Sequence, residues 1–584
     1  MPPTLFSRAT RIWPGIRPGA LAAAVAAAFA FVIVAAACSS SSNDGAPAAT
    51  PAATSTPLPT ATPGVDVVST PVATASPAIT VTPVLPPADT GAGVLRFSVP
   101  EAGPNFDIHR EVSQSVSTWG IGLIYSRLFR NASGESDAVV ECELCEGWEL
   151  VDPGRLQIVL RPDVRWQRIA PLNGRQLIAS DVVFSLERQR APGSPNGDLL
   201  AGIGTITAVD DLTVEMEVDG LNSDLLLNLA DGRTRIVAPE AVAVNGDLLR
   251  GPNVGSGPWI WVETTGQTAT YDRNPDYFEP DRPRIQGLQI SIIPSVDTRV
   301  AAFRTGLLDI ADVPADEIGR LTRALPDSTM KSVLHAGTGA EIALNTATFP
   351  FDSRKFRQAV FRAMDPWRDL EEVWNGDGRV SLGIPSPRDS WLLSDDALRT
   401  AFADPGRAAE LMSESGVQPV GPVEITVGLF GDAYPAQAQR VADALATLGF
   451  ESTIREVSTR DFADRVWIGG EYQVFVGAQA PVDGITDDLL AVHHSAGLWN
   501  TTGFGSEELD SLIELQAEQL DPSERRRTLL DAQFRILEGA HRFTVAARVT
   551  NWFARGWVGG FDPDPRRGEN AWLSLITVGE RPDL

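Results

Sequence analysis

Residues 39–92 set the limits of what this chain can fold into. The segment holds ten prolines, no aromatic residue and only three charged residues, Asp44, Asp66 and Asp89. A stretch so poor in large apolar side chains cannot bury enough surface to offset its conformational entropy, so it is predicted to stay unfolded as an extended tether. Folding is therefore predicted to begin near residue 93, and the roughly 490 residues that follow are enough for two or three domains.

The segment before the tether has the pattern of an export signal. Arg8, Arg11 and Arg17 precede an almost unbroken apolar run over 21–34, and three alanines precede Cys38. A run of this length is short for a membrane span and typical of a signal peptide. The pattern resembles a bacterial lipobox, although alanine stands at position 35 where leucine is usual. We therefore expect a signal peptide over 1–37, a lipidated Cys38 and a tether over 38–92. An uncleaved membrane anchor is the alternative.

The charge of the chain narrows the choice of partners. The formal net charge is -27 and the pI is near 4.6. A strongly acidic protein is repelled by nucleic acids and by anionic membrane surfaces, so neither is expected as a partner.

The cysteines and histidines do not form a recognisable metal or catalytic motif. Cys142 and Cys145 lack the second pair that a structural zinc site needs, so a local disulfide is predicted, with free thiols or redox or metal chemistry as alternatives. The histidines lack zinc-type spacing: His109, His335, His493, His494 and His541. Gly-x-Ser-x-Gly, phosphate-loop and His-Glu-x-x-His motifs are absent. No metal, no cofactor and no catalytic residue are predicted.

Hydrophobic periodicity and capping residues predict an α/β body. In the first half, strands are expected over 94–99, 156–160, 212–218 and 287–294, and helices over 118–129, 180–190 and 296–305. In the second half, strands over 423–430, 451–457 and 472–478 alternate with helices over 435–448 and 461–468. This order implies a parallel sheet with right-handed crossovers. Two more helices are expected, over 507–519 and after an N-cap at Asp521.

Five blocks of sequence, taken in order, resemble one protein family. They lie at 166–190, at 255–259 with 273–278, at 292–310, at 345–359 and at 557–561. The first contains the run Asp-Val-Val-Phe-Ser-Leu-Glu-Arg over 181–188, and the last reads Trp-Val-Gly-Gly-Phe. Together they are similar to family 5 solute-binding proteins, the dipeptide- and oligopeptide-binding components of ABC importers.

This resemblance implies a fold and a division into domains. The fold is an α/β, two-lobed clamshell of the periplasmic-binding-protein type II, with an extra third domain. Lobe I would comprise 93–135, 256–343 and 545–584, the additional domain 136–255 and lobe II 344–544. The hinge strands would cross near 341–345 and near 544–548, and the lobes would close on a ligand by hinge motion.

The resemblance also implies where a ligand is held. One segment is the loop of Glu111, Val112, Ser113 and Gln114. The other follows the strand over 472–478 and contains Gln479, Ala480, Val482 and Asp483, with Asp487 close behind. Peptide binders of the family usually carry a Trp-x-x-Asp-Tyr pattern whose aspartate pairs with the ligand's amino terminus. Here Gln479 stands at the tryptophan position and Val482 at the aspartate, one residue before Asp483. Candidate aromatic walls are Trp119, Trp374, Trp391 and Trp499.

The implied function is capture of a solute by lobe closure and its delivery to an ABC permease. The protein would be a monomer on the extracytoplasmic face of the cell membrane, lipid-anchored and without enzymatic activity, and a peptide is the expected solute. Alternatives are the same fold with an oligosaccharide, an opine or a metal chelate as ligand, a surface sensor or adhesion protein without a transport role, and a cell-wall hydrolase.

Overall fold

The computed structural model describes residues 93–582 except 104, 114, 133–138, 153, 220–221 and 483. The predicted signal peptide, Cys38 and the tether lie outside the described residues. Among the residues that are described, no helix combines the length and the apolar character needed to cross a bilayer.

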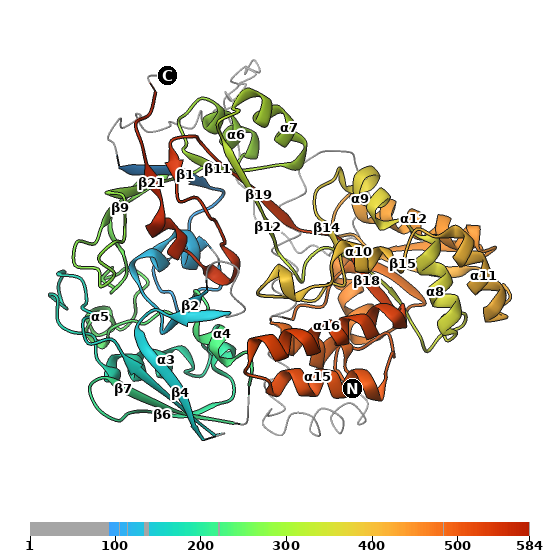
Figure 1. The fold of residues 1–584 in the computed structure, drawn as a ribbon, viewed down its shortest axis with the longest axis horizontal. Helices are drawn as coiled ribbons and strands as arrows, with labels where there is room; N and C mark the ends of the chain where they lie inside the picture. The colour runs from blue at the N-terminus through green and yellow to red at the C-terminus, as the bar shows by residue number, and fades with distance from the viewer. Residues whose placement is uncertain are drawn as a thin grey trace, which may run out of the picture.

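Two lobes lie side by side, and an additional domain extends from the first (Figure 1). The first lobe contains a four-stranded sheet of order β1-β10-β9-β8 and a three-stranded sheet of order β11-β19-β12. The second lobe contains a six-stranded sheet of order β14-β18-β13-β17-β15-β16, and the additional domain a four-stranded sheet of order β4-β5-β7-β6. The predicted fold class is confirmed.

Strands of the first lobe come from separate parts of the chain. β1 (Val94–Val99) pairs in parallel with β10 (Gly287–Ile292), beside β9 (Thr268–Arg273) and β8 (Trp259–Thr265). β19 (Val549–Ala554) lies between β11 (Ile310–Val313) and β12 (Thr329–Leu334) and is antiparallel to both. The remaining elements are α6 (Val296–Arg304), α7 (Ala315–Ala324), β2 (Phe129–Asn131), β3 (Val140–Cys142), β20 (Val558–Gly559) and β21 (Thr577–Val578).

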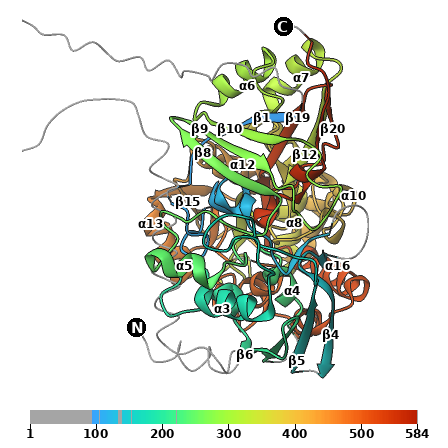
Figure 2. The ribbon, with the colours of Figure 1, turned by 90° about the vertical axis from the view of Figure 1, so that its left-hand side faces the viewer.

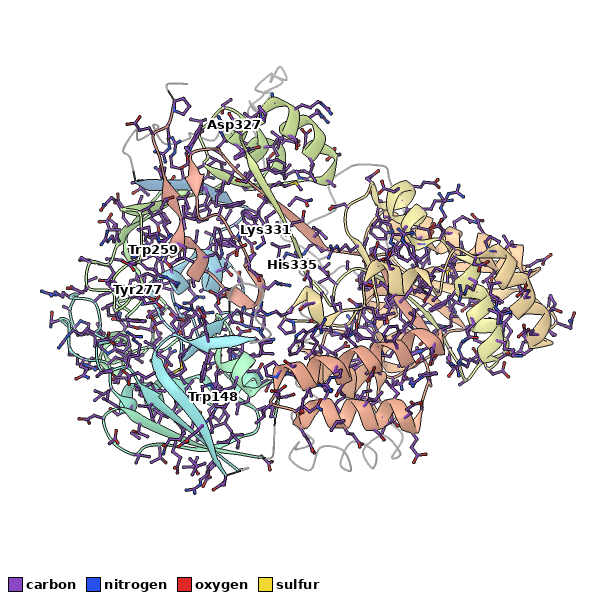
Figure 3. The ribbon with its side chains drawn as sticks, viewed as in Figure 1. Trp148, Trp259, Tyr277, Asp327, Lys331 and His335 are labelled. Carbon is purple, nitrogen blue, oxygen red and sulfur yellow. A yellow bond between two sulfur atoms is a disulfide. The ribbon has the colours of Figure 1, made fainter. Side chains whose placement is uncertain are left out.

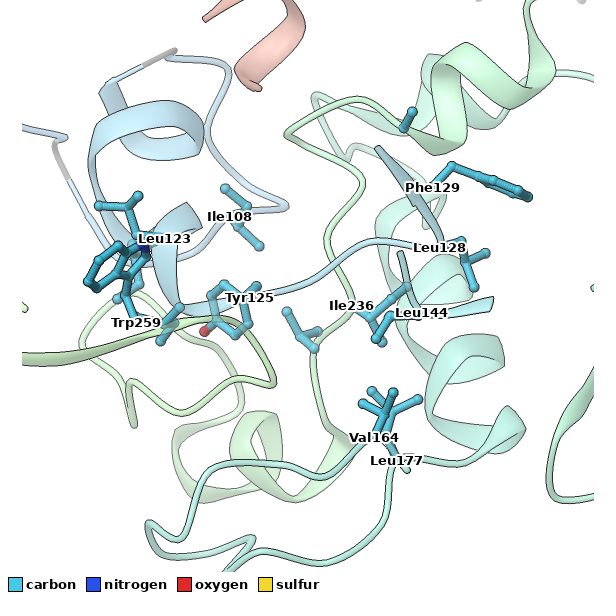
Figure 4. Close-up of a cluster of buried hydrophobic side chains, with 14 of the residues drawn as sticks. Ile108, Leu123, Tyr125, Leu128, Phe129, Leu144, Val164, Leu177, Ile236 and Trp259 are labelled. Carbon is cyan, nitrogen blue, oxygen red and sulfur yellow. The ribbon is translucent and has the colours of Figure 1, made fainter. Parts of the chain in front are cut away.

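The additional domain shares its core with the first lobe. Its antiparallel sheet joins β4 (Cys145–Asp152), β5 (Arg155–Leu160), β7 (Thr213–Val218) and β6 (Ile203–Ala208). Its helices are α3 (Ala179–Gln189), α4 (Leu225–Leu229) and α5 (Pro239–Asn245). One cluster of buried apolar side chains runs from Leu123 and Trp259 to Val164 and Leu177 (Figure 4). This domain and helices α6 and α7 lie at opposite ends of the first lobe (Figure 2).

The second lobe contains the predicted parallel strands. β15 (Val423–Gly428) pairs in parallel with β16 (Ser452–Val457) and with β17 (Val474–Ala478), which confirms that prediction. The sheet is completed by β13 (Ala340–Leu344), β14 (Arg379–Ser381) and β18 (Arg542–Ala547). Its helices are α8 (Arg354–Ala363), α9 (Pro366–Trp374), α10 (Asp395–Arg399), α11 (Pro405–Ser415), α12 (Ala433–Thr447), α13 (Thr459–Phe462), α14 (Ile485–Asp488), α15 (Glu507–Glu518) and α16 (Pro522–Gly539).

One predicted helix, over 118–129, is wrong. Ser115–Trp119 forms a single π turn and Ile121–Ile124 a single 3-10 turn, after which the chain is extended up to β2. Gly122 packs so closely on the Ser117 carbonyl that a side chain there would overlap it. The apolar residues that suggested a helix are buried by tertiary packing, which overrides the local periodicity.

Two crossings of the chain join the lobes, at 335–339 between β12 and β13 and at Arg548 between β18 and β19. Two hydrogen bonds link these crossings. The His335 N–H donates to the Arg548 carbonyl at 2.8 Å, and the Arg548 N–H donates to Thr338 Oγ1 at 2.9 Å. The predicted first crossing near 341–345 is wrong. Ala340 already pairs with Ala478 of β17, so those residues belong to the sheet of the second lobe.

A disulfide joins Cys142 to Cys145. We predict that changing both cysteines to serine lowers the free energy of unfolding by no more than about 2 kcal/mol, because so short a loop restricts the unfolded chain little. Urea denaturation of both proteins measures the difference. A loss well above that value would show that the bond also maintains native contacts around the turn.

Candidate functional site

The loop predicted from Glu111 to Gln114 lies between β1 and the π turn. Glu111 is held within its own loop, since Oε1 accepts from the N–H groups of Val112 at 3.0 Å and Ser113 at 3.2 Å, and Oε2 accepts from Asn105 at 3.2 Å. Val112 is 45 % exposed, and the Ser113 carbonyl accepts from Val116 at 3.1 Å. Gln114 lies outside the described residues. The accessible side chain here is that of Val112, because the Glu111 carboxylate is already hydrogen-bonded.

The second predicted loop follows β17. Gln479 Nε2 donates to the Gly383 carbonyl at 2.6 Å, and its Oε1 is buried without a partner. The Ala480 carbonyl accepts from the Val482 N–H at 2.8 Å, and both side chains are half-buried. Asp483 lies outside the described residues, and Asp487 is exposed on α14. The Gln479 amide therefore fastens this loop to the Gly383 segment of the same lobe.

Trp391 was predicted to contact ligand, and the structure contradicts this. Its side chain is only 1 % exposed and belongs to the hydrophobic core of the second lobe. The guanidinium of Arg525 lies 5.6 Å from the ring centroid, and the Trp391 carbonyl accepts from Gln533 at 2.7 Å. The gain from burying a large aromatic side chain explains why this residue lies in the core.

The other candidate tryptophans are partly buried and differ in their surroundings. Trp119 packs against aromatic rings of the first lobe, 5.5 Å from Trp552 and 6.1 Å from Trp572 between centroids. Trp374 donates to Gln437 at 3.0 Å, and Trp499 packs with the cluster around Phe462. The latter two are in the second lobe, so of these three tryptophans only Trp119 lies in the first.

A buried polar cluster beneath the second loop was missed by sequence reasoning. Glu341 on β13 pairs with Arg542 on β18 at 2.8 Å, and their side chains are 5 % and 4 % exposed. Burial raises the pKa of Glu341, and Arg542 counteracts this. Burial also raises the pKa of Asp488 well above its usual range, and Asp488 lies 3.6 Å from His493. The sequence signal for this cluster was one charged residue in each of two apolar strands, Glu341 in β13 and Arg542 in β18.

The additional domain touches the second lobe through a buried ion pair. Arg525 of α16 lies 2.6 Å from Asp224, the residue before α4, and donates to the Ser223 carbonyl at 2.9 Å. Asp224 also accepts from the Thr486 N–H at 3.0 Å, at the start of α14. Burial favours the neutral form of Asp224, but the charge of Arg525 and its hydrogen bond outweigh the effect of burial. The pKa of Asp224 is therefore lowered. Figure 1 shows α4 beside the first turn of α16.

A second set of contacts joins the lobes. Arg566 of the first lobe donates to Asp389 of the second at 2.8 Å, and Arg388 donates to the Ala132 carbonyl at 2.8 Å. His335, labelled with Lys331 in Figure 3, lies at the crossing and bonds Thr550 at 2.9 Å. Burial and then the charge of Arg548 lower the pKa of His335 to about 4, so the imidazole is neutral at pH 7.

The described part of the chain also has hollows away from this boundary. A hollow of about 520 Å³ is lined by residues of the first lobe alone: Arg284, Thr329, Val558, Gly560, Phe561, Asp562 and Leu575. Among the described residues, no group of three or more His, Cys, Asp or Glu side chains is placed to hold a metal ion.

A comparison with protein families identifies the chain. The model of the bacterial extracellular solute-binding proteins, family 5 middle region, matches residues 139–496. The chain belongs to this family. This solute-binding protein is extracytoplasmic and is not an enzyme. In this family, solutes are delivered to ABC transporters.

Three similar proteins are informative. The solute-binding protein is 26 % identical over 455 residues to "Heme-binding protein A" of Haemophilus influenzae, covering 73 % of this chain and 82 % of that one. It is 26 % identical over 423 residues to "Di/tripeptide-binding protein 2" of Pseudomonas aeruginosa, covering 68 % and 78 %. The solved structure of HbpA2 from Haemophilus parasuis has a TM-score of 0.72 at 22 % identity, covering 83 % of this chain and 100 % of that one.

Proposed function

We propose that this solute-binding protein captures a short peptide between its two lobes and delivers it to an ABC import permease. The observation that carries the proposal is the joint. Two crossings that are hydrogen-bonded to each other connect the lobes, and ion pairs such as Arg525 with Asp224 and Arg566 with Asp389 also link them. Lobes joined in this way can open and close as rigid bodies, and a ligand that touches both favours the closed state.

A peptide is favoured over other solutes by one relative and by the form of the loops. The protein is similar to a di/tripeptide-binding protein. In the predicted loops, the side chains of Glu111 and Gln479 already bond within the protein, so recognition there would rest on the side chains of Val112, Ala480 and Val482 and on backbone groups other than those bonded within the loops. Backbone recognition suits peptides of varied sequence. Asp483 or Asp487 would pair with the ligand's amino group.

The lipid anchor and the tether complete the proposal. A diacylglycerol on Cys38 would hold the protein at the membrane, and the segment 38–92 would let the lobes search for solute and still reach the permease. Mass spectrometry of the amino-terminal peptide from the membrane fraction tests this part. An uncleaved segment over 1–37 would contradict it.

Calorimetry with purified full-length protein tests the ligand. We expect di- and tripeptides to bind with dissociation constants in the micromolar range or below, and maltotriose not to bind. Hemin is included because a relative carries the name heme-binding protein. Tight binding of hemin or of the sugar, with no binding of any peptide, would contradict the peptide proposal and leave solute capture intact.

A further inference from the structure

The hollow of about 520 Å³ in the first lobe is as large as many ligand sites, which measure about 300 to 1,000 Å³. Apolar side chains form one part of its wall, those of Val558, Phe561 and Leu575. None of its lining residues belongs to the two predicted ligand loops. Because apolar surface gains free energy when it is removed from water, this hollow is a candidate site for an occupant other than the transported solute.

The two charged side chains that line the hollow differ in their pairing. Asp562 forms an ion pair with Lys331 of β12. Arg284 is exposed, and within the described chain its guanidinium has no hydrogen bond or ion pair. Its backbone is fixed, since the Arg284 N–H donates to the Ser574 carbonyl at 3.1 Å, next to Leu575. The hollow therefore combines an apolar wall with one unpaired positive charge, which suits an apolar segment that carries a carboxylate.

The first described residues of the chain lie beside this hollow. β1 pairs in parallel with β10, and the Gln286 N–H donates to the Gly93 carbonyl at 2.5 Å. Parallel strands start at the same end of a sheet, so the chain enters β1 close to Arg284, which stands two residues before Gln286. After β21, which lies beside β1 in Figure 1, Arg581 donates to the Val94 carbonyl. The hollow thus borders the point where the preceding segment joins the lobe.

The sequence just before this point complements the hollow. Residues 84–89 read Val-Leu-Pro-Pro-Ala-Asp, so apolar residues are followed by the carboxylate of Asp89. The chain from Asp89 to Gly93 spans at most about 14 Å. Arg284 lies about 7 Å along the chain from Gln286, which is bonded to Gly93. The Asp89 carboxylate is therefore within reach of the Arg284 guanidinium, and the apolar residues before it are within reach of the apolar wall.

A weak interaction is enough to keep so near a segment docked. A short link to the lobe gives an effective concentration in the millimolar range, so a segment whose free peptide binds with a Kd of about 1 mM is docked about half of the time or more. Proline restricts the backbone before docking, so less conformational entropy is lost. Apolar contacts and one exposed ion pair need to supply only this modest affinity.

We propose that the segment 84–89 docks in this hollow of the first lobe. Its valine, leucine and prolines cover the apolar wall, and the Asp89 carboxylate pairs with Arg284. The free part of the tether then ends before residue 84. Docking holds the first lobe in one orientation relative to the end of the tether, while the second lobe stays free to move. The inference does not depend on the identity of the solute.

Thiol labelling of the full-length protein tests the docking. Ala88→Cys places a thiol in the segment, on the same face as Leu85 if the backbone has the three residues per turn of polyproline II, and Ala61→Cys places one far from the lobe. Mass spectrometry of proteolytic peptides measures how fast a maleimide labels each thiol. The protection ratio is the rate in urea divided by the rate in buffer for the same variant, so that local effects on thiol reactivity cancel.

We expect a protection ratio of at least about 3 for Ala88→Cys, and a ratio near 1 for Ala61→Cys. Adding Arg284→Glu to Ala88→Cys should bring the ratio down to near 1, because the carboxylate of Asp89 then meets a like charge. Adding Asp89→Arg as well should restore protection, because the two charges are exchanged. Arg323→Glu is the matched control: Arg323 is exposed on α7, and its substitution should leave the ratio unchanged.

Three results would overturn the docking. The first is a ratio near 1 for Ala88→Cys, which would show that the segment does not occupy the hollow. The second is protection that Arg284→Glu does not lower, in a variant that circular dichroism shows to be folded. The third is protection that rises with protein concentration, which would mean that the segment docks on a second copy of the chain. None of these measurements involves solute, so the proposed function is tested separately.

Discussion

Replacing Asp224 with alanine should separate the additional domain from the second lobe and weaken solute binding by at least about tenfold. The substitution leaves Arg525, whose side chain is 2 % exposed, without its carboxylate. Breaking one side of a buried ion pair costs about 3 to 5 kcal/mol, which is large compared with a conformational preference of a few kcal/mol. The contact exists only while the lobes are together, so the closed population falls. Small-angle scattering should show a larger radius of gyration, and calorimetry the lower affinity.

The control for this change is Asp211→Ala. Asp211 lies in the same domain and is exposed, and its side chain has no hydrogen bond or ion pair within the described chain. This variant should match wild type in scattering and in affinity. If Asp224→Ala also behaves like wild type, the contact between the additional domain and the second lobe does not stabilise closure, and the additional domain needs another explanation.

The Glu569→Gln substitution should lower the free energy of unfolding by about 3 to 5 kcal/mol, because Arg127 loses the charge of its main partner while buried. Arg127 donates to both Glu569 oxygens at 3.0 Å and to Glu143 at 3.1 Å, and its side chain is 1 % exposed. Glu569 also accepts from the N–H of Asn131 at 2.9 Å. The pair thereby joins the carboxyl-terminal segment to β2. Urea denaturation with a far-ultraviolet signal measures the loss.

The same residue predicts a pH dependence. Burial alone would raise the pKa of Glu569, but Arg127 and backbone N–H groups lower it to about 2. A carboxyl with a folded pKa below its unfolded value of about 4.5 stabilises the protein above pH 4.5, and this contribution is lost as the pH falls toward 2. Wild type should lose about 3 kcal/mol more than Glu569→Gln across that interval. Parallel pH profiles for the two proteins would contradict this.

Glu538→Gln serves as the surface control for both measurements. Glu538 pairs with Arg535 at 2.8 Å, and its side chain is 50 % exposed. Exposed pairs contribute little, so the change should stay within about 0.5 kcal/mol at every pH.

The regular elements were predictable because their signals are local. Leu156, Ile158 and Leu160 alternate with Gln157 and Val159 along β5, and the three side chains are buried. Asp521 caps α16 by accepting from the Glu524 N–H at 2.8 Å, as its position before Pro522 suggested. Such patterns depend on neighbours within one turn or one strand, so the amino-acid sequence carries them in full.

The candidate site was predicted less well, because its residues meet only after folding. Trp391 resembled an aromatic wall and is core, since the Arg525 side chain and helix α16 cover it. Arg548 falls at the end of a predicted hinge strand, and nothing in its neighbours along the chain distinguishes it from other exposed arginines. Its place at the crossing, where its N–H donates to Thr338 Oγ1, depends on a residue 210 positions away along the chain.

The sequence by itself determined the α/β class and the family, because periodicity and ordered blocks are properties of neighbouring residues. Tertiary structure alone decided where the lobes cross and which carboxylates are paired. Asp224 and Arg525 stand 301 positions apart and meet at 2.6 Å, and Arg127 and Glu569 stand 442 apart. Charge and hydrogen bonding act through space, so these pairings follow from the packing of whole lobes.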